Sequence, residues 1–146
     1  MVEEPFFADP LRKLEEEGLS VLVLQDGEVA YKSYQPGVRP LLELVDWFPA
    51  GLDGATAVDR VVGGCAAAVF AHLRVHKVLA LTGSVAAEKT LHSWSIEYDF
   101  RQLVPDIRTR DNSDSCPFEK LSRAFSEPRA LIDAMRHQVA EFACRK

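Results

Sequence analysis

Two side chains in the sequence, a carboxyl group and a thiol, have the chemistry of an acid–base or nucleophilic centre. Asp59 lies near the start of residues 57–68, whose spacing predicts a helix, and its carboxyl group could act as a general acid or base or accept a hydrogen bond from a ligand hydroxyl. Capping of its own helix is the commoner role for an aspartate at such a position. Cys116 directly precedes Pro117 at the expected start of another helix, where the helix dipole would stabilise a thiolate.

The reactivity of Cys116 depends on the charges around it. Arg108 and Arg110 would favour the thiolate. Asp114 and Glu119 would oppose it, and no histidine lies close in the sequence to act as a base. A structural or merely exposed thiol is therefore the alternative interpretation of this cysteine.

Other groups could bind a ligand without reacting with it. Arg108 and Arg110 have the guanidinium geometry that clamps a phosphate or carboxylate, although the aspartates of the same loop could pair with them instead. Ser84 follows a predicted strand and could present backbone N–H groups to an anion, or simply form the turn into the next helix. Arg60 lies next to Asp59, so that an acid and a base stand together.

Two adjacent glycines, Gly63 and Gly64, interrupt the predicted helix of residues 57–68. Glycine is about 1 kcal/mol less favourable than alanine inside a helix, so the pair indicates that a neighbouring backbone or a ligand approaches closely. Packing against the sheet is the preferred interpretation, because no glycine-rich loop between a strand and a helix precedes the pair. Gly63 is also a candidate ligand contact.

The sequence predicts no metal site and no cofactor. His72 and His76 have i,i+4 spacing, but the residues between them lack the glutamate of a zinc-protease helix. The three cysteines, Cys65, Cys116 and Cys144, form no Cys-x-x-Cys pair, and their odd number over separate segments argues against a disulfide framework.

The elements that must position these groups predict an α/β protein. Helices are expected at residues 9–17, 41–48, 57–73, 85–91 and, near the C-terminus, within 117–145; strands are expected at 19–24, 28–33, 78–81 and 96–104. Asp26-Gly27 is the turn pair of a tight hairpin, and right-handed crossovers place the helices that begin near Asp59 and Ser84 on a face of the sheet. The expected architecture is a three-layer α/β/α domain with a mixed sheet, formed by residues 1–146 around a core at 19–115.

Composition limits the partners and the compartment. The 146 residues carry a net charge of −5, which argues against binding a long nucleic acid but leaves a nucleotide-sized ligand open. No segment approaches the roughly 18 uninterrupted apolar residues of a membrane span, and the acidic N-terminus lacks the order of a signal peptide. We therefore expect a cytoplasmic protein without a membrane partner.

The order of the elements and four segments carry a resemblance to a known family. The segments are residues 22–27, 37–42, 59–63 with the sequence Asp-Arg-Val-Val-Gly, and 107–119, which contains Cys-Pro-Phe-Glu. Over about residues 19–135 the chain resembles a bacterial family of unknown function, grouped as zinc-less proteins with the cytidine deaminase-like fold. The resemblance implies that fold and no established activity.

In zinc deaminases, His-x-Glu or Cys-x-Glu opens one helix and Pro-Cys-x-x-Cys opens the next. The corresponding openings here are residues 59–61 and 84–87, and neither motif is present. The resemblance therefore implies a metal-free pocket surrounded by Asp59, Cys116, Arg110 and Ser84, and it argues against hydrolytic deamination by the standard route.

Different classes of function are compatible with these features. The first is a small-molecule binding protein or enzyme, its ligand a nucleotide or related metabolite, with Asp59 as polar anchor or acid–base group and Cys116 as a second polar or nucleophilic group. The alternative is a non-catalytic regulatory or assembly module that forms a homo-oligomer through Phe6, Phe7 and the terminal helices. A third is a zinc deaminase whose ligands, such as His92 and the cysteines, do not follow the usual motifs.

Overall fold

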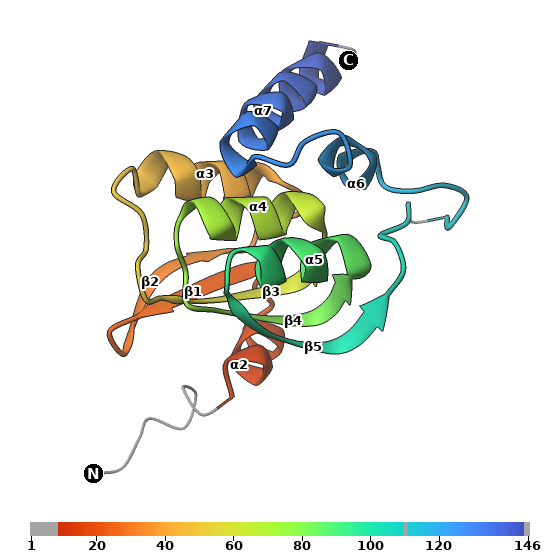
Figure 1. The fold of residues 1–146 in the computed structure, drawn as a ribbon. Coiled ribbons are helices and arrows are strands. Elements are labelled where there is room, and N and C mark those ends of the chain that lie inside the picture. Colours follow the sequence, from red (N-terminus) through yellow and green to blue (C-terminus); the bar gives the residue numbers. More distant parts are fainter. Residues whose placement is uncertain (1–8, 110, 145–146) are drawn as a thin grey trace.

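A mixed sheet of five strands forms the centre of the protein, in a computed structural model that describes residues 9–109 and 111–144 (Figure 1). The strands lie in the order β2-β1-β3-β4-β5. β1 pairs antiparallel with both β2 and β3, whereas β3, β4 and β5 run parallel. Their bounds are β1 (Val21–Gln25), β2 (Glu28–Ser33), β3 (Thr56–Val62), β4 (Lys77–Ser84) and β5 (Glu97–Val104).

The hairpin of β1 and β2 is confirmed, and its turn has the predicted chemistry. Asp26 and Gly27 have φ angles of 53° and 78°, and positive φ at both central residues is what a two-residue type I′ turn requires. On its other side β1 pairs with β3, so that Val21 lies opposite Asp59. The beginning of β1 and the end of β3 are therefore neighbours at one edge of the sheet.

Helices cover both faces of the sheet, but unequally (Figure 1). One face carries α2 (Pro10–Glu16), whose buried Leu11 and Leu14 form the smaller apolar cluster with β1 and β3. The other face carries the larger core. Its helices are α3 (Arg39–Trp47), α4 (Gly64–His72), α5 (Val85–Ser93), α6 (Pro117–Ser122) and α7 (Pro128–Cys144), the last two packed on α4. The α/β class with a mixed sheet is thus confirmed.

The prediction of a helix over residues 57–68 is wrong in its first half. Thr56–Val62 forms the central strand β3, and α4 begins only at Gly64. Because clusters cover both faces of this strand, its residues lack the polar and apolar alternation that reveals a half-buried strand. Asp59 therefore lies within a strand and does not cap a helix.

The remaining expectations concern the chain ends and membranes. Phe6 and Phe7, predicted to take part in a homo-oligomer interface, lie outside the described residues. Among the helices of residues 9–109 and 111–144, none is both long and apolar enough to cross a membrane.

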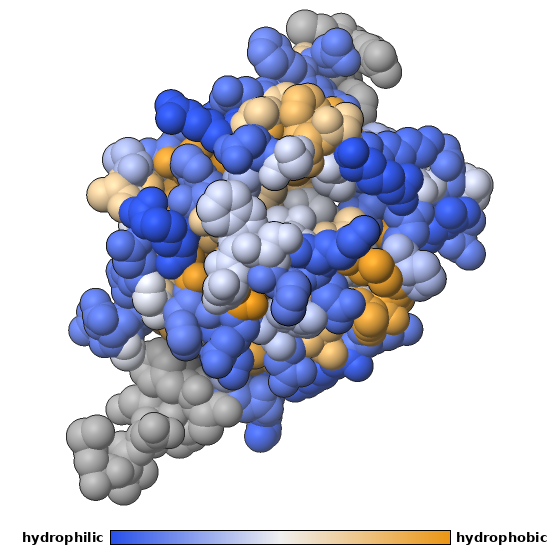
Figure 2. Space-filling model, in the orientation of Figure 1, coloured by the Kyte–Doolittle hydropathy of each residue, from blue (hydrophilic) through white to orange (hydrophobic). Residues whose placement is uncertain are grey.

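Figure 2 shows that the face carrying α5 is largely hydrophilic, with apolar side chains gathered near the end of β5 and on α7.

Candidate functional site

A cavity of about 560 Å³ opens at the carboxyl end of β3. It lies between the beginning of β1, the N-terminus of α4, the loop before α3 and the loop before α6. Ligands of α/β proteins commonly bind at this edge, because helix N-termini converge there. The walls are mainly apolar, with Val21, Leu41 and Phe118 among the lining residues, and this volume lies within the usual range for small-molecule sites.

Asp59 lines this cavity from β3, with 8% of its surface exposed. Its Oδ1 accepts a hydrogen bond from the backbone N–H of Arg60 at 2.8 Å. Burial raises the pKa of the Asp59 carboxyl to about 7, against the weaker opposing effects of the Arg60 and Val61 backbone N–H groups and of the Arg60 guanidinium. Asp59 can therefore exchange its proton near neutral pH.

Arg60 lines the cavity as well, but it projects from the opposite face of β3 because successive strand residues alternate. Its Nε donates a hydrogen bond to the Leu19 carbonyl oxygen at 2.7 Å. Leu19 belongs to the apolar cluster under α2, so Arg60 is fixed on that side of the sheet. The predicted acid and base thus share the cavity without facing each other across it.

Glu119 is a buried group that was not among the predicted site residues, although it ends the Cys-Pro-Phe-Glu segment and was expected to oppose a Cys116 thiolate. It is 3% exposed and lies in the first turn of α6. Its Oε1 accepts from the Gly64 N–H at 2.8 Å and its Oε2 accepts from the Ile107 N–H at 3.0 Å. A carboxylate from one helix therefore caps the N-terminus of another. The only local signal is a glutamate three residues after the N-cap, a position typical of caps within the same helix.

The adjacent glycines allow α6 to approach α4, and not the sheet as predicted. A Cβ atom on Gly64 would lie 2.2 Å from Ser122 Oγ and 2.5 Å from Ser122 Cβ. A Cβ atom on Gly63, the N-cap of α4, would lie 2.9 Å from Glu119 Oε1. The pair is therefore required by helix packing, while Gly63 and Gly64 also line the cavity.

We expect Gly64→Ala to lower the free energy of unfolding by about 1–2 kcal/mol, because the clash with Ser122 outweighs the better helix propensity of alanine. In a Ser122→Gly background the same substitution should be neutral or stabilising, because the clashing atoms are gone. Urea unfolding of the four proteins of this double-mutant cycle measures both effects. An equal loss in the two backgrounds would contradict the proposed contact.

Cys116 lines the same cavity as Asp59. It is the N-cap of α6, is partly exposed, and is a free thiol. Cys65, in the first turn of α4, also lines the cavity, and its Sγ donates to the Phe118 carbonyl oxygen at 3.1 Å. Burial raises the pKa of Cys65 to about 12, so this sulfur keeps its proton. The side chain of Cys144 lies outside the described residues.

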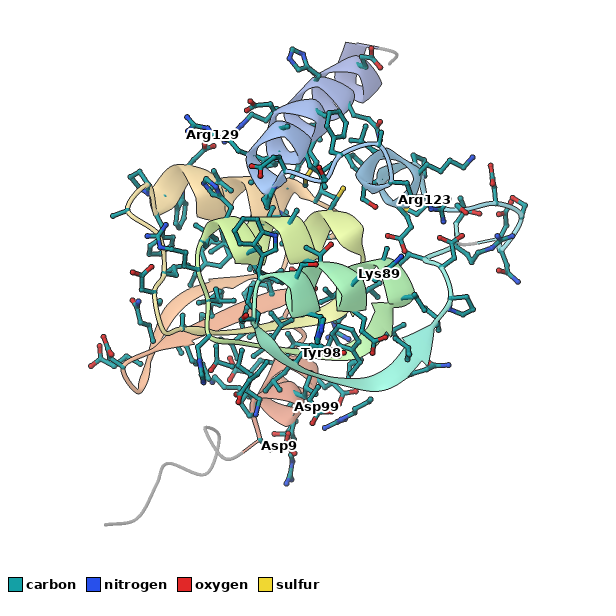
Figure 3. The ribbon with its side chains drawn as sticks, in the orientation of Figure 1. Asp9, Lys89, Tyr98, Asp99, Arg123 and Arg129 are labelled. Carbon is teal, nitrogen blue, oxygen red and sulfur yellow. The ribbon has the colours of Figure 1, made fainter. Side chains whose placement is uncertain are left out.

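The loop between β5 and α6 forms one wall of the cavity and is fixed to α6 by hydrogen bonds and an ion pair. The Cys116 N–H donates to the Ile107 carbonyl oxygen at 2.8 Å. Asp106 accepts from the Ser115 hydroxyl and pairs with Arg123, which Figure 3 shows beside this loop. Cys116 and Glu119 are thereby held together at the cavity.

Two predicted ligand-binding residues, Ser84 and Arg108, are not among the described residues that line the cavity. Ser84 is fully buried, and its hydroxyl accepts from the Ala87 N–H at 3.1 Å, which caps α5. Arg108 forms an ion pair with Asp106. Arg110 lies outside the described residues. Of the predicted site residues, the structure therefore brings together Asp59, Arg60, Gly63 and Cys116.

The donor set of a zinc deaminase is not reproduced here. Within residues 9–109 and 111–144, no three His, Cys, Asp or Glu side chains are grouped so that they could hold a metal ion. The polar side chains among the described lining residues are two buried carboxyls, one guanidinium, the hydroxyls of Ser20 and Tyr34, and two thiols, of which Cys65 retains its proton. They do not fit a zinc site of that type.

Fold and site together define an α/β protein with a mixed five-stranded sheet and a largely apolar cavity at the carboxyl end of its central strand. The chain belongs to the TM1506 family, described as a domain of unknown function (DUF1893), which it matches over residues 10–139. A crystal structure of a DUF1893 family protein (TM1506) from Thermotoga maritima is similar, with a TM-score of 0.83 and 25% sequence identity over 94% of this chain and 92% of that chain. No curated protein matches the sequence.

Proposed function

We propose that this protein binds a small molecule in the cavity at the end of β3, with Asp59 as the polar anchor. The observation that carries the proposal is a carboxyl group that is buried against an open, mainly apolar cavity and accepts no hydrogen bond from a side chain of the described residues. Among the described residues, the donors to Asp59 are the backbone N–H groups of Arg60 and Val61. Burial of a carboxyl group without a compensating side chain is unfavourable, and such groups are concentrated at functional sites.

The position of the cavity, at the N-terminus of a helix that follows a parallel strand, supports a metal-free site in the place where zinc deaminases hold their metal. In zinc deaminases, residues at the openings of two successive helices hold the metal. The equivalent openings in this chain are α4, at Gly64, and α5, at Val85, each of which follows a parallel strand. Asp59, at which the first opening was predicted, lies within β3, five residues before α4 begins at Gly64. In our proposal the cavity takes the place of the metal centre, and Cys116 is its second polar or nucleophilic group.

A panel of nucleobases, nucleosides, nucleotides and related metabolites tests the proposal by isothermal titration. We expect at least one class to bind, and we expect Asp59→Asn to weaken that binding at least tenfold, which corresponds to about 1.4 kcal/mol. Asp99→Asn is the matched control, because Asp99 is exposed on β5, and Figure 3 shows it away from α4. Binding that survives Asp59→Asn unchanged would remove Asp59 as the anchor, and a panel without any ligand would count against the cavity as a binding site.

A further inference from the structure

The charges around the cavity restrict what its ligand can be. Among the residues that the structure describes, the charged ones that line it are Asp59, Arg60 and Glu119. The two acidic groups are both more than nine-tenths buried. The basic group among these three, Arg60, approaches from the α2 face of the sheet, and its Nε donates to the Leu19 backbone carbonyl. The interior of the cavity is therefore rich in acceptors and poor in free cationic groups.

The N-terminus of α4 would ordinarily attract an anion, because its backbone N–H groups carry a partial positive charge. Here the protein supplies that anion itself, since Glu119 Oε1 accepts from the Gly64 N–H at 2.8 Å. A ligand carboxylate or phosphate placed at this helix end would lie against the Glu119 carboxylate. Two like charges in a buried environment repel strongly, which disfavours such a ligand.

Asp59 favours a ligand group that donates a hydrogen bond. Its described donors are two backbone N–H groups of neighbouring residues, so lone pairs of the carboxyl group remain for a ligand. Most of the other lining side chains are apolar, among them Val21 and Leu41. Of the two lining hydroxyl groups, that of Ser20 donates to the Ser33 carbonyl oxygen, and Tyr34 is an exposed residue. A bound molecule satisfies Asp59 by donating a hydrogen bond to it.

We infer that the cavity selects uncharged or cationic molecules that carry N–H donors, such as amides, amidines and amines, and that it excludes carboxylates and phosphates. This inference rests on the proposed function, because it assigns a ligand class to the same cavity. It also predicts an order of affinity within a nucleotide series. A nucleotide should bind more weakly than the corresponding base or nucleoside, because its phosphate is disfavoured in the cavity.

Benzamidine, benzamide and benzoate test the inference, because they share one size and shape and differ in charge. Titrations at pH 8, followed by backbone amide NMR shifts, should show benzamidine binding at least tenfold more tightly than benzoate, with benzamide between them. The affected amides should include those of Asp59, Gly64 and Cys116. Asp59→Asn should reduce the preference for benzamidine over benzoate at least fivefold, whereas the exposed control Asp99→Asn should leave it unchanged.

The outcomes distinguish this inference from the proposed function. Benzoate binding to the same amides as tightly as benzamidine would overturn the charge preference while supporting a ligand cavity. The inference would also fail if the preference persisted in Asp59→Asn, because the selectivity would then arise elsewhere. If none of the three probes shifted any amide around the cavity, the proposed binding function itself would be contradicted. The dispersion of the amide spectrum reports that each variant is folded.

Discussion

Replacing Asp59 with asparagine is expected to stabilise the protein at alkaline pH by about 4 kcal/mol, because raising a carboxyl pKa by one in the folded state corresponds to about 1.4 kcal/mol. Burial raises the pKa of Asp59 from 3.8 to about 7. The folded state therefore holds this proton more tightly than the unfolded chain does, and wild-type stability falls as the pH rises from about 4 to about 7. Asparagine stays neutral and can still accept from the Arg60 N–H.

The stabilisation by Asp59→Asn should consequently depend on pH. Urea unfolding should give a gain of about 4 kcal/mol at pH 8 that shrinks to about 1 kcal/mol at pH 4.5. The exposed control Asp99→Asn should stay within about 0.5 kcal/mol of wild type at both pH values. A gain that does not change with pH would mean that Asp59 titrates like a solvated carboxyl group.

The same substitution is expected to weaken ligand binding. Asp59→Asn should therefore raise the stability of the fold and lower the affinity for a ligand, and these opposite effects would indicate the role of Asp59. A residue that destabilises the fold at physiological pH, and whose neutral isostere would remove that destabilisation, contributes something other than stability. Functional sites commonly retain such unfavourable groups. Opposite signs for stability and affinity in one variant would therefore support a binding role more strongly than either measurement alone.

Features that depend on a few neighbouring residues could be predicted from the sequence. The Asp26-Gly27 turn needs only two residues with positive φ, and both have it. The Asp9-Pro10 start of α2 likewise depends on one side chain, which accepts from the Arg12 N–H at 3.2 Å. Such interactions form within one turn of chain, so the local sequence contains all of their determinants.

The central strand could not be assigned in the same way. Thr56–Val62 is covered on both faces, by α4 on one side and α2 on the other, and this burial removes the alternation that identifies a strand. The small residues of α4 follow almost immediately, and their spacing extended the predicted helix backwards. Only the pairing of β3 with β1 and β4, which are distant in the sequence, distinguishes the two alternatives.

The candidate site could likewise be predicted only in part, because some of its contacts join residues far apart in the sequence. The resemblance suggested that Asp59 and Cys116 surround one pocket, and the structure places both at the cavity, although their roles stay predictions. The role of Glu119 depends on Gly64, 55 residues earlier in the chain, and no local pattern connects the two. Ser84 had the correct local interpretation as a turn into a helix, since its hydroxyl caps α5.

Removal of the Glu119 carboxylate is expected to be among the most destabilising single changes in this protein. Glu119→Ala should lower the free energy of unfolding by about 3 kcal/mol, because an unpaired buried donor is unfavourable by about 1–3 kcal/mol and two donors lose their acceptor. These are the N–H groups of Gly64 and Ile107. Loss of the negative charge at the α4 N-terminus adds to the effect.

Glu119→Gln separates the two hydrogen bonds from the packing of the side chain. Glutamine keeps one oxygen, but its amide group would face the other backbone N–H, so this variant should lose about half as much stability as Glu119→Ala. Glu141→Ala, at an exposed position on α7, is the control and should change stability by less than about 0.5 kcal/mol. If Glu119→Ala were as mild as this control, water from the cavity would have replaced the carboxylate, and Glu119 would not be what fixes the loop before α6 to the N-terminus of α4.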